Sequence, residues 1–278
     1  MINSATLRHR QWFPLLLLFL FASCAPTTIA RPPVTAGLVA AAAARWARLS
    51  ELSNSHETLQ TIADLDLQTT GPRYHFKAAL LLKRPALMRI ESIPLIGPPN
   101  FLLSLTKESL KVFLPGEKFF YLGQPVRENL AFFLPIGGLA PADIVAILMG
   151  LPPPLADQQF DIREISTESS SGLEIFSKGL KVQTLWFTKD GEHLSFMEIH
   201  PPGGGVINVN YGAYRKTGNN WLPEKVTLAD PDKKARITVR YHDISWNENG
   251  EEASFDLPIP AGVSPLPLEQ ANGIPGNQ

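Results

Sequence analysis

The sequence predicts a mainly β protein of the α+β class: one curved antiparallel sheet of about ten strands with an apolar face covered by helices. From Thr58 onward, apolar and polar residues alternate with a period of two, as in strands that bury one face. Turn signals such as Pro115-Gly116 and Asn249-Gly250 separate these segments. Two further segments have helical character, and a sheet with one apolar face needs such a cover.

The N-terminus has the features of a lipoprotein signal peptide. Basic residues 8–10 precede the apolar run 12–22, which is shorter than the ~20 apolar residues of a membrane-spanning helix. The segment Phe21-Ala22-Ser23-Cys24 is similar to a lipobox, and Cys24 is the only cysteine of the chain. The sequence therefore predicts a signal peptide at residues 1–23 and a lipid on Cys24. The alternative is an ordinary signal peptide that happens to contain a cysteine.

The residues after Cys24 predict where the protein is held. Ala25 stands where Asp, by resemblance to enterobacterial sorting signals, would favour the inner membrane. We therefore expect a lipid-anchored protein of the outer membrane that faces the periplasm. Residues 24–35 are rich in Pro and Thr and predict an extended, lipidated tether.

A helix is expected over residues 36–53, with Thr35 as a possible N-cap. Leu38, Ala42, Trp46 and Leu49 recur at helical spacing, with Leu52 continuing the stripe. The stripe favours a helix that faces the core over one that lies on a membrane surface.

A second helix is expected at residues 141–150. Pro141 suits the first helical position, Asp143 lies in the first turn and Gly150 suits the C-cap. The helix is apolar almost all round, so it should be buried. Both helices are natural covers for the sheet.

The end of the chain differs from the rest. Residues 256–278 contain five prolines and little apolar pattern, which predicts a disordered tail or a weakly docked arm. The folded domain is therefore expected to span residues 36–255.

The sequence contains no clear motif for nucleic-acid binding, phosphate binding, metal binding or catalysis. A formal net charge of −1 gives no basic field for nucleic acid. Gly203-Gly204-Gly205 leads into a strand and predicts a turn, not a phosphate loop. Asp64 and Asp66 could chelate a cation, but they are also the outward positions of a solvated strand, which we favour. No nucleophile, metal or cofactor motif is found, so we expect no enzyme, no metal and no cofactor.

Between about residues 56 and 247, the chain resembles the LolA/LolB family of lipoprotein carriers and receptors, and is most similar to LolB, itself a lipoprotein. Three blocks carry the resemblance: 83–89 with 93–97, similar to a strand and its protruding loop; 134–136 with 147–152, similar to a helix motif; and 209–214 with 222–228, similar to a late hairpin. The departures are Ala146 where Trp is common, Ile96 before Gly97, Pro98-Pro99, and the proline-rich tail.

The resemblance implies a half-barrel whose concave apolar face holds acyl chains. At about 0.8 kcal/mol per methylene, moving a palmitoyl chain from membrane to water costs on the order of 12 kcal/mol, so such cargo needs an apolar container. The expected partners are lipoprotein acyl chains and a LolA-like periplasmic carrier, and the protein is expected to be a monomer. The expected cavity residues are Leu65, Leu67, Phe76, Leu80, Leu82, Met88, Ile90, Leu103, Leu105, Val112, Leu114, Ile144, Ile147 and Leu148. The alternative is that these side chains fill a dry core.

The resemblance also singles out the loop Pro94-Leu95-Ile96-Gly97. Its prolines exclude it from a strand ladder. Burial of each large aliphatic side chain is worth about 1.5–3 kcal/mol, so the loop either folds back as a plug or inserts into a membrane surface. The expected function is a LolB-like receptor that inserts lipoproteins into the outer membrane. The alternative is a lipoprotein of the same fold that binds another lipid or lipophilic ligand, or belongs to an envelope complex.

Overall fold

The computed structural model describes residues 36–53, 58–155, 159–247 and 251–270. The expected signal peptide, Cys24 and the tether lie outside these residues. The first part of the chain forms α1 (Ala36–Ser53), β1 (Thr58–Gln68), β2 (Tyr74–Lys83), β3 (Leu87–Ser92), β4 (Leu102–Leu105), β5 (Leu110–Leu114), β6 (Phe119–Gly123), α2 (Arg127–Leu130) and α3 (Pro141–Leu148).

The second part is almost entirely strand. It forms β7 (Phe160–Ser166), β8 (Ser171–Ser177), β9 (Leu180–Phe187), β10 (Leu194–Ile199), β11 (Ile207–Tyr211), β12 (Tyr214–Thr217), β13 (Asn220–Pro223), β14 (Lys225–Asp230), β15 (Ala235–Tyr241), β16 (Ser245–Asn247), η1 (Glu252–Phe255), β17 (Pro265–Pro267) and η2 (Leu268–Gln270). None of the helices in the described part of the chain combines the length and hydropathy needed to span a bilayer.

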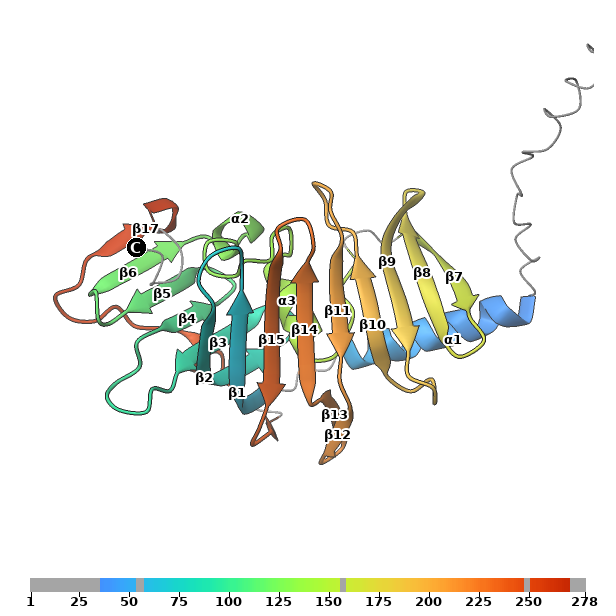
Figure 1. Ribbon diagram of the computed structural model, residues 1–278, viewed down its shortest axis with the longest axis horizontal. Coiled ribbons are helices and arrows are strands. Elements are labelled where there is room, and N and C mark those ends of the chain that lie inside the picture. The colour runs from blue at the N-terminus through green and yellow to red at the C-terminus, as the bar shows by residue number, and fades with distance from the viewer. Residues whose placement is uncertain (1–35, 54–57, 156–158, 248–250, 271–278) are drawn as a thin grey trace, which may run out of the picture. The chain divides into compact units, whose positions relative to one another are not determined.

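One large, curved, open sheet dominates the fold (Figure 1). Its order is β17-β6-β5-β4-β3-β2-β1-β15-β14-β11-β10-β9-β8-β7, with β16 added to β1. All neighbours are antiparallel except β17 and β6. The sheet has 15 described strands, and β12 and β13 form a separate hairpin, so the expectation of about ten strands is too low. Short strands such as β4, with four residues, give too brief an alternation to be counted reliably.

The period-two pattern places the core on the inner face of the sheet. On β2, Ala78, Leu80 and Leu82 are buried, whereas the residues between them are partly exposed. Leu65 of β1 lies in register with Phe76 of β2 and Val239 of β15, so apolar residues of neighbouring strands share this face. The first six strands and the later strands therefore form one continuous apolar surface, joined where β1 pairs with β15.

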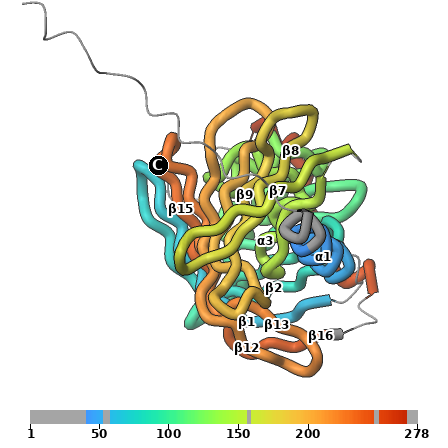
Figure 2. The backbone as a smooth tube through the Cα atoms, turned by 90° about the vertical axis from the view of Figure 1, so that its right-hand side faces the viewer, coloured from blue at the N-terminus to red at the C-terminus, as the bar shows by residue number. Residues whose placement is uncertain are grey.

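Both expected helices are present and lie on the same side of the sheet (Figure 2). α3 begins at Pro141 and is followed by Gly150, whose φ of +79° suits a helix C-terminus. α1 buries Ala42 and Leu49 in the same core, and the Trp46 ring contacts Phe160 of β7 edge to face at 5.5 Å. Leu52, expected on the buried stripe, is 46% exposed.

The sequence predicts a disordered tail or a weakly docked arm from residue 256 onward, and residues 256–270 are docked on the sheet. We call residues 251–270 the C-terminal strap. It buries Phe255, Leu257 and Leu268, and its segment β17 extends the sheet by pairing with β6. Prolines are tolerated there because β17 is an edge strand. Residues 271–278 lie outside the described residues.

Candidate lipid-binding site

A small, enclosed, wholly apolar space lies between the inner face of the sheet and α3. Its volume is about 30 Å³, similar to that of one water molecule. It is lined by Leu65, Leu80, Met88, Ile90, Leu134, Ile136, Leu139, Ile144, Leu148, Leu228, Ile237 and Val239. The space is too small for an acyl chain, so the open apolar cavity expected from the sequence is not confirmed. Side chains of α3 and of the loop before it occupy the inner face at this point.

Two tyrosines hold the C-terminal end of α3 over this space. The Tyr241 hydroxyl of β15 donates a hydrogen bond to the Leu148 carbonyl oxygen at 2.8 Å. The Tyr211 hydroxyl of β11 contacts the Ile147 carbonyl at 3.2 Å and the Leu151 carbonyl at 3.4 Å. The Leu148 carbonyl is in the last turn of α3, where carbonyls lack a partner within the helix, whereas the Ile147 carbonyl also accepts the Gly150 N–H. Burial raises the pKa of both phenols, so both remain protonated donors.

A carboxylate fixes the other end of α3. The Ala140 backbone N–H donates to Oδ2 of Asp143 at 2.7 Å, which satisfies one of the free amides at the helix start. Burial raises the pKa of Asp143, opposed by this hydrogen bond and by the charge of Arg127. α3 is thus capped within its own segment at its start, and it is held to the sheet by the tyrosine hydroxyls at its end and by apolar contacts along its length.

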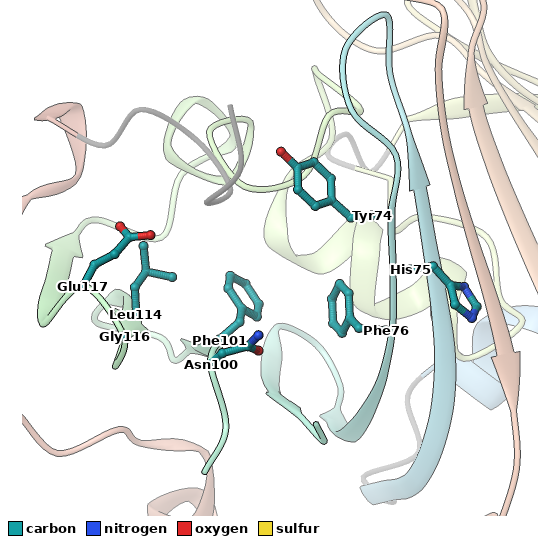
Figure 3. Close-up of a pocket in the computed structure, with 8 residues that line it drawn as sticks. All are labelled: Tyr74, His75, Phe76, Asn100, Phe101, Leu114, Gly116 and Glu117. Atoms are coloured by element: carbon teal, nitrogen blue, oxygen red, sulfur yellow. The ribbon is translucent and has the colours of Figure 1, made fainter. Parts of the chain in front are cut away.

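A second, open hollow of about 330 Å³ lies where β2 begins (Figure 3). Phe76 continues the inward series of β2 beyond Leu80, and its ring lies 6.2 Å from that of Phe101. Tyr74 and Leu114 add apolar surface, while Asn100 and Glu117 provide polar groups. We call this hollow the mouth, because it is on the same face of the sheet as the enclosed space and opens to solvent.

The loop of residues 93–100 emerges beside the mouth. Its base is closed by Ser92, whose Oγ accepts the N–H groups of Asn100 and Phe101 at 3.0 Å each. At its tip, Leu95 and Ile96 are 104% and 93% exposed. The alternative in which this loop folds back as a plug is therefore wrong. The loop holds two large aliphatic side chains fully in solvent.

The structure divides the expected cavity residues into three groups. Those around the enclosed space are Leu65, Leu80, Met88, Ile90, Ile144 and Leu148. Two others, Phe76 and Leu114, line the mouth. The remainder are buried in the surrounding core: Leu67, Leu82, Leu103, Leu105, Val112 and Ile147. Their role in binding lipid stays a prediction.

Sequence reasoning missed half of the residues around the enclosed space. Leu228, Ile237 and Val239 lie on strands whose alternation was visible, but only the register of β14 and β15 with β1 brings them to this site. Leu134, Ile136 and Leu139 belong to a loop rich in Gly and Pro, which has no periodic signal.

The outward acids of β1 do not form a cation site. Asp64 accepts a hydrogen bond from His242 at 2.8 Å and pairs with Lys77 at 3.3 Å, so the pKa of its carboxyl is lowered chiefly by His242. Asp66 is paired with Arg73, which lowers its pKa in the same way. Within the described ranges, no group of three or more His, Cys, Asp or Glu residues could hold a metal ion.

Solved structures share this architecture at low sequence identity. A LolA-superfamily protein from Nitrosomonas europaea superposes with a TM-score of 0.52 and 13% identity, covering 78% of this chain and 97% of that one. A putative outer-membrane lipoprotein-sorting domain from Vibrio parahaemolyticus gives 0.55 and 11%, covering 78% and 97%. A DUF1329-family protein from Desulfovibrio piger gives 0.55 and 13%, covering 79% and 97%.

No model of a known protein family matches the sequence, and no curated protein matches it. The superposed structures show that the fold is that of LolA-superfamily and lipoprotein-sorting domains, as the sequence blocks indicated. The closer similarity to LolB stays a prediction.

Proposed function

We propose that this protein is a lipid-anchored envelope carrier that binds acyl chains between the inner face of its sheet and α3. In this proposal it receives lipoproteins from a soluble, LolA-like periplasmic carrier and inserts them into the outer membrane. The role is one of binding and transfer and includes no catalysis. Support comes from the fold and from the continuous apolar inner face.

Uptake requires α3 to move. The enclosed space of about 30 Å³ cannot admit cargo unless α3 and the preceding loop withdraw from the sheet. The apolar lining would then contact acyl chains in place of Ile144 and Leu148. Because α3 is held at its C-terminal end by two tyrosine hydroxyls, movement of this helix requires few hydrogen bonds to break. The mouth offers the adjoining route, since Phe76 lies on the same strand face as Leu80.

The exposed loop carries the proposal most directly. Leu95 and Ile96 gain about 1.5–3 kcal/mol each when they leave water, and the protein itself does not bury them. A bilayer surface beside the mouth would bury them and would receive the released acyl chains there. Transfer then proceeds downhill, from the carrier to this protein and from this protein to the membrane.

A charge at the loop tip tests this role. Residues 35–278 form one compact unit, so we expect a chain shortened to these residues to fold, which circular dichroism checks first. Leu95→Glu should leave the melting temperature unchanged, since the side chain has no protein contacts to lose, and should reduce release of acylated cargo into liposomes severalfold. Leu180→Glu is the matched control, because Leu180 is 73% exposed at the first position of the distant strand β9. Equal release by Leu95→Glu and by the unaltered chain would reject the membrane role of the loop.

The anchor is tested separately. We expect Cys24→Ala to prevent lipid attachment and processing by the lipoprotein signal peptidase. Membrane-bound protein of unchanged mass after inhibition of that peptidase would reject the lipid anchor.

The second candidate is a carrier of the same fold for another envelope lipid. In its favour, the loop departs from the LolA/LolB pattern at Ile96 and Pro98-Pro99. Depletion of the protein in cells separates the two. Accumulation of lipoproteins on a periplasmic carrier supports the receptor function, whereas normal lipoprotein sorting with altered lipid composition supports the second.

A further inference from the structure

A polar groove of about 620 Å³ lies on the outer face of the sheet, opposite the proposed lipid site. We call it the outer groove. Its walls include Gln68, Phe196, Glu198, Asn208, Asn210 and Arg236. These residues come from β1, β10, β11 and β15, which are far apart in sequence but close together in the sheet.

The register of five strands explains the groove. One cross-strand row runs Glu198, Asn208, Ala229, Arg236 and Gln68. The next row on the same face runs Phe196, Asn210, Thr227, Thr238 and Asp66. The small residues of both rows fall on β14 and β15, and longer side chains stand on either side. The groove therefore has Ala229 in its floor, between Asn208 and Arg236.

The walls present unused hydrogen-bonding groups. Asn208 is half-buried and Asn210 exposed, and within the described residues neither side-chain amide has a hydrogen-bond partner. Each amide offers both donors and an acceptor, which suits hydroxyl and acetamido groups. Glu198 has only a long contact of 3.9 Å with Lys181, so its carboxylate is also available.

An aromatic surface adjoins these amides. Phe196 is half-buried on the groove wall, and Trp186 of β9 is its cross-strand neighbour. Trp186 packs over Gly172 of β8, where an added Cβ would lie 3.0 Å from Trp186 Cε3. Aromatic rings of this kind offer flat apolar surfaces to ligands that also carry polar groups.

The charge of the groove selects among polar ligands. Two acids, Glu198 and Asp230, are balanced by two bases, Lys234 and Arg236. A phosphate-rich lipid headgroup or a nucleic acid would need an excess of positive charge. A neutral, hydroxyl-rich chain does not.

We propose that the outer groove binds a glycan built of N-acetylated amino sugars, the chemistry of cell-wall glycan strands. Phe196 would contact a sugar ring, while Asn208 and Asn210 would bond its hydroxyl or acetamido groups. The groove and the lipid site lie on opposite faces, so this inference does not depend on the proposed function. A protein with both sites would hold the cell wall while its inner face remains free to take cargo.

Titration with a soluble oligomer of N-acetylglucosamine tests the inference, using the purified full chain in detergent micelles. We expect saturable binding, weakened about tenfold by Phe196→Ala through loss of the ring contact. Asn210→Ala should weaken it severalfold, and because this side chain is exposed, the variant tests the groove even if Phe196→Ala fails to fold. Lys216→Ala, on the exposed β12–β13 hairpin, is the matched control and should bind like the unaltered chain.

Three results would overturn the inference. The first is no saturable binding by the unaltered chain, and the second is that both groove variants bind as tightly as the unaltered chain. The third is tighter binding of a phosphorylated saccharide than of the neutral oligomer. Purified cell wall should also retain the full chain and release Asn210→Ala more readily than Lys216→Ala.

Discussion

The inner face of the sheet and the C-terminal strap stabilise the same strands in different ways. On the inner face, Leu80, Met88 and Val112 are almost completely buried, and neighbouring strands repeat the same alternation. The strap has no alternation. It is held by a few buried side chains, above all Phe255 and Leu268, and by hydrogen bonds to its main chain.

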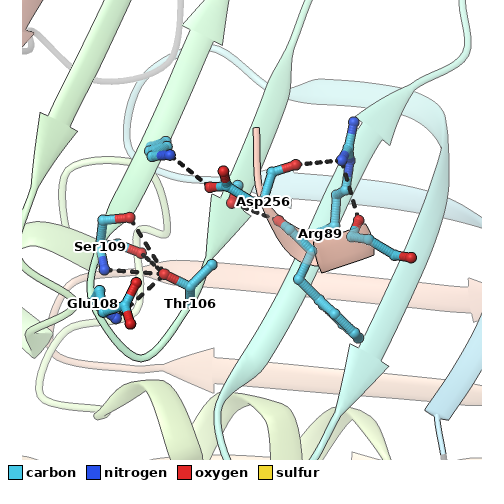
Figure 4. Close-up of polar contacts among 9 residues, drawn as sticks. Arg89, Thr106, Glu108, Ser109 and Asp256 are labelled. Atoms are coloured by element: carbon cyan, nitrogen blue, oxygen red, sulfur yellow. Dashed lines mark hydrogen bonds and ion pairs between the residues drawn. The ribbon is translucent and has the colours of Figure 1, made fainter. Parts of the chain in front are cut away.

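The polar contacts of the strap are on the outer face of β3, β4 and β5 (Figure 4). Arg89 donates to the carbonyl oxygens of Ser254 and Asp256 at 3.1 and 2.6 Å. Ser104 donates to the Phe255 carbonyl at 2.6 Å, and Lys111 pairs with the Asp256 carboxylate at 2.5 Å. The comparison teaches that an apolar face is encoded by a repeated pattern, whereas a docked strap needs only a few anchors and leaves little trace in the sequence.

The largest effect is expected on the inner face. Leu80→Ala should lower the free energy of unfolding by about 2–5 kcal/mol, because it removes buried contacts and enlarges the enclosed space. Thermal and urea unfolding measure the loss, and binding of an apolar dye should increase. Leu180→Ala, at an exposed position, should change neither quantity. Similar losses from the two substitutions would contradict the assignment of Leu80 to the core.

A smaller and more local effect is expected at the strap. An added Cβ at Gly123 would lie 2.6 Å from Leu268 Cδ1 and 2.9 Å from Leu268 Cβ. Gly123→Ala should therefore cost about 1–3 kcal/mol by overpacking. Hydrogen exchange should rise at residues 264–270 while the strands β8 and β9 keep their protection. Gly116→Ala is the control, since a Cβ there meets no atom within 4 Å. Uniform loss of protection across the sheet would mean that the strap is not a separate stabilising unit.

The hydrogen bond between Tyr241 and α3 allows movement of this helix to be measured separately from the stability of the fold. Tyr241→Phe removes the hydrogen bond to the Leu148 carbonyl and should cost about 1 kcal/mol. It should also raise the rate at which an apolar dye enters, because α3 is held less firmly. Stopped-flow fluorescence measures that rate. A slower or unchanged rate in the destabilised variant would show that α3 does not control access.

The smallest effect depends on pH. The ion pair with Lys111 is the main cause of the lowered pKa of Asp256. A carboxyl whose pKa is lower in the folded state stabilises the fold above its ordinary pKa of 3.8, and this contribution disappears as the pH falls through the lowered value. Lys111→Met should thus cost about 0.2–1 kcal/mol at pH 7, since Asp256 is half exposed, and nothing at strongly acidic pH. Urea unfolding across this range tests the sign, and a difference that grows on acidification would contradict it.

The sequence was a sufficient guide where a local pattern repeats. The helix at residues 36–53, the helix beginning at Pro141 and the inward series of β2 are in the expected places because each depends on the spacing of nearby residues. The blocks similar to the LolA/LolB family indicated which fold to expect, and composition and periodicity alone could not specify it.

What depends on contacts between distant residues could not be predicted. Alternation identifies the apolar face, but it does not show that the side chains of Ile136 and Leu139 close the space over it. The outer groove arises from the register of Ala229 with Asn208 and Arg236, which only the assembled sheet fixes. The burial of Leu268 depends on the missing side chain of Gly123, about 145 residues earlier in the chain.

Photocrosslinking of an acylated peptide is the most direct test of the central claim that acyl chains bind under α3. A palmitoylated peptide with a photoreactive group at the end of its acyl chain would be bound to the chain of residues 35–278 and mapped by mass spectrometry. We expect crosslinks at Leu80, Met88, Ile144 and Leu148, reduced by competing unlabelled lipopeptide. Crosslinks confined to exposed apolar residues such as Phe119 and Leu122, with no competition, would contradict an acyl-chain site on the inner face.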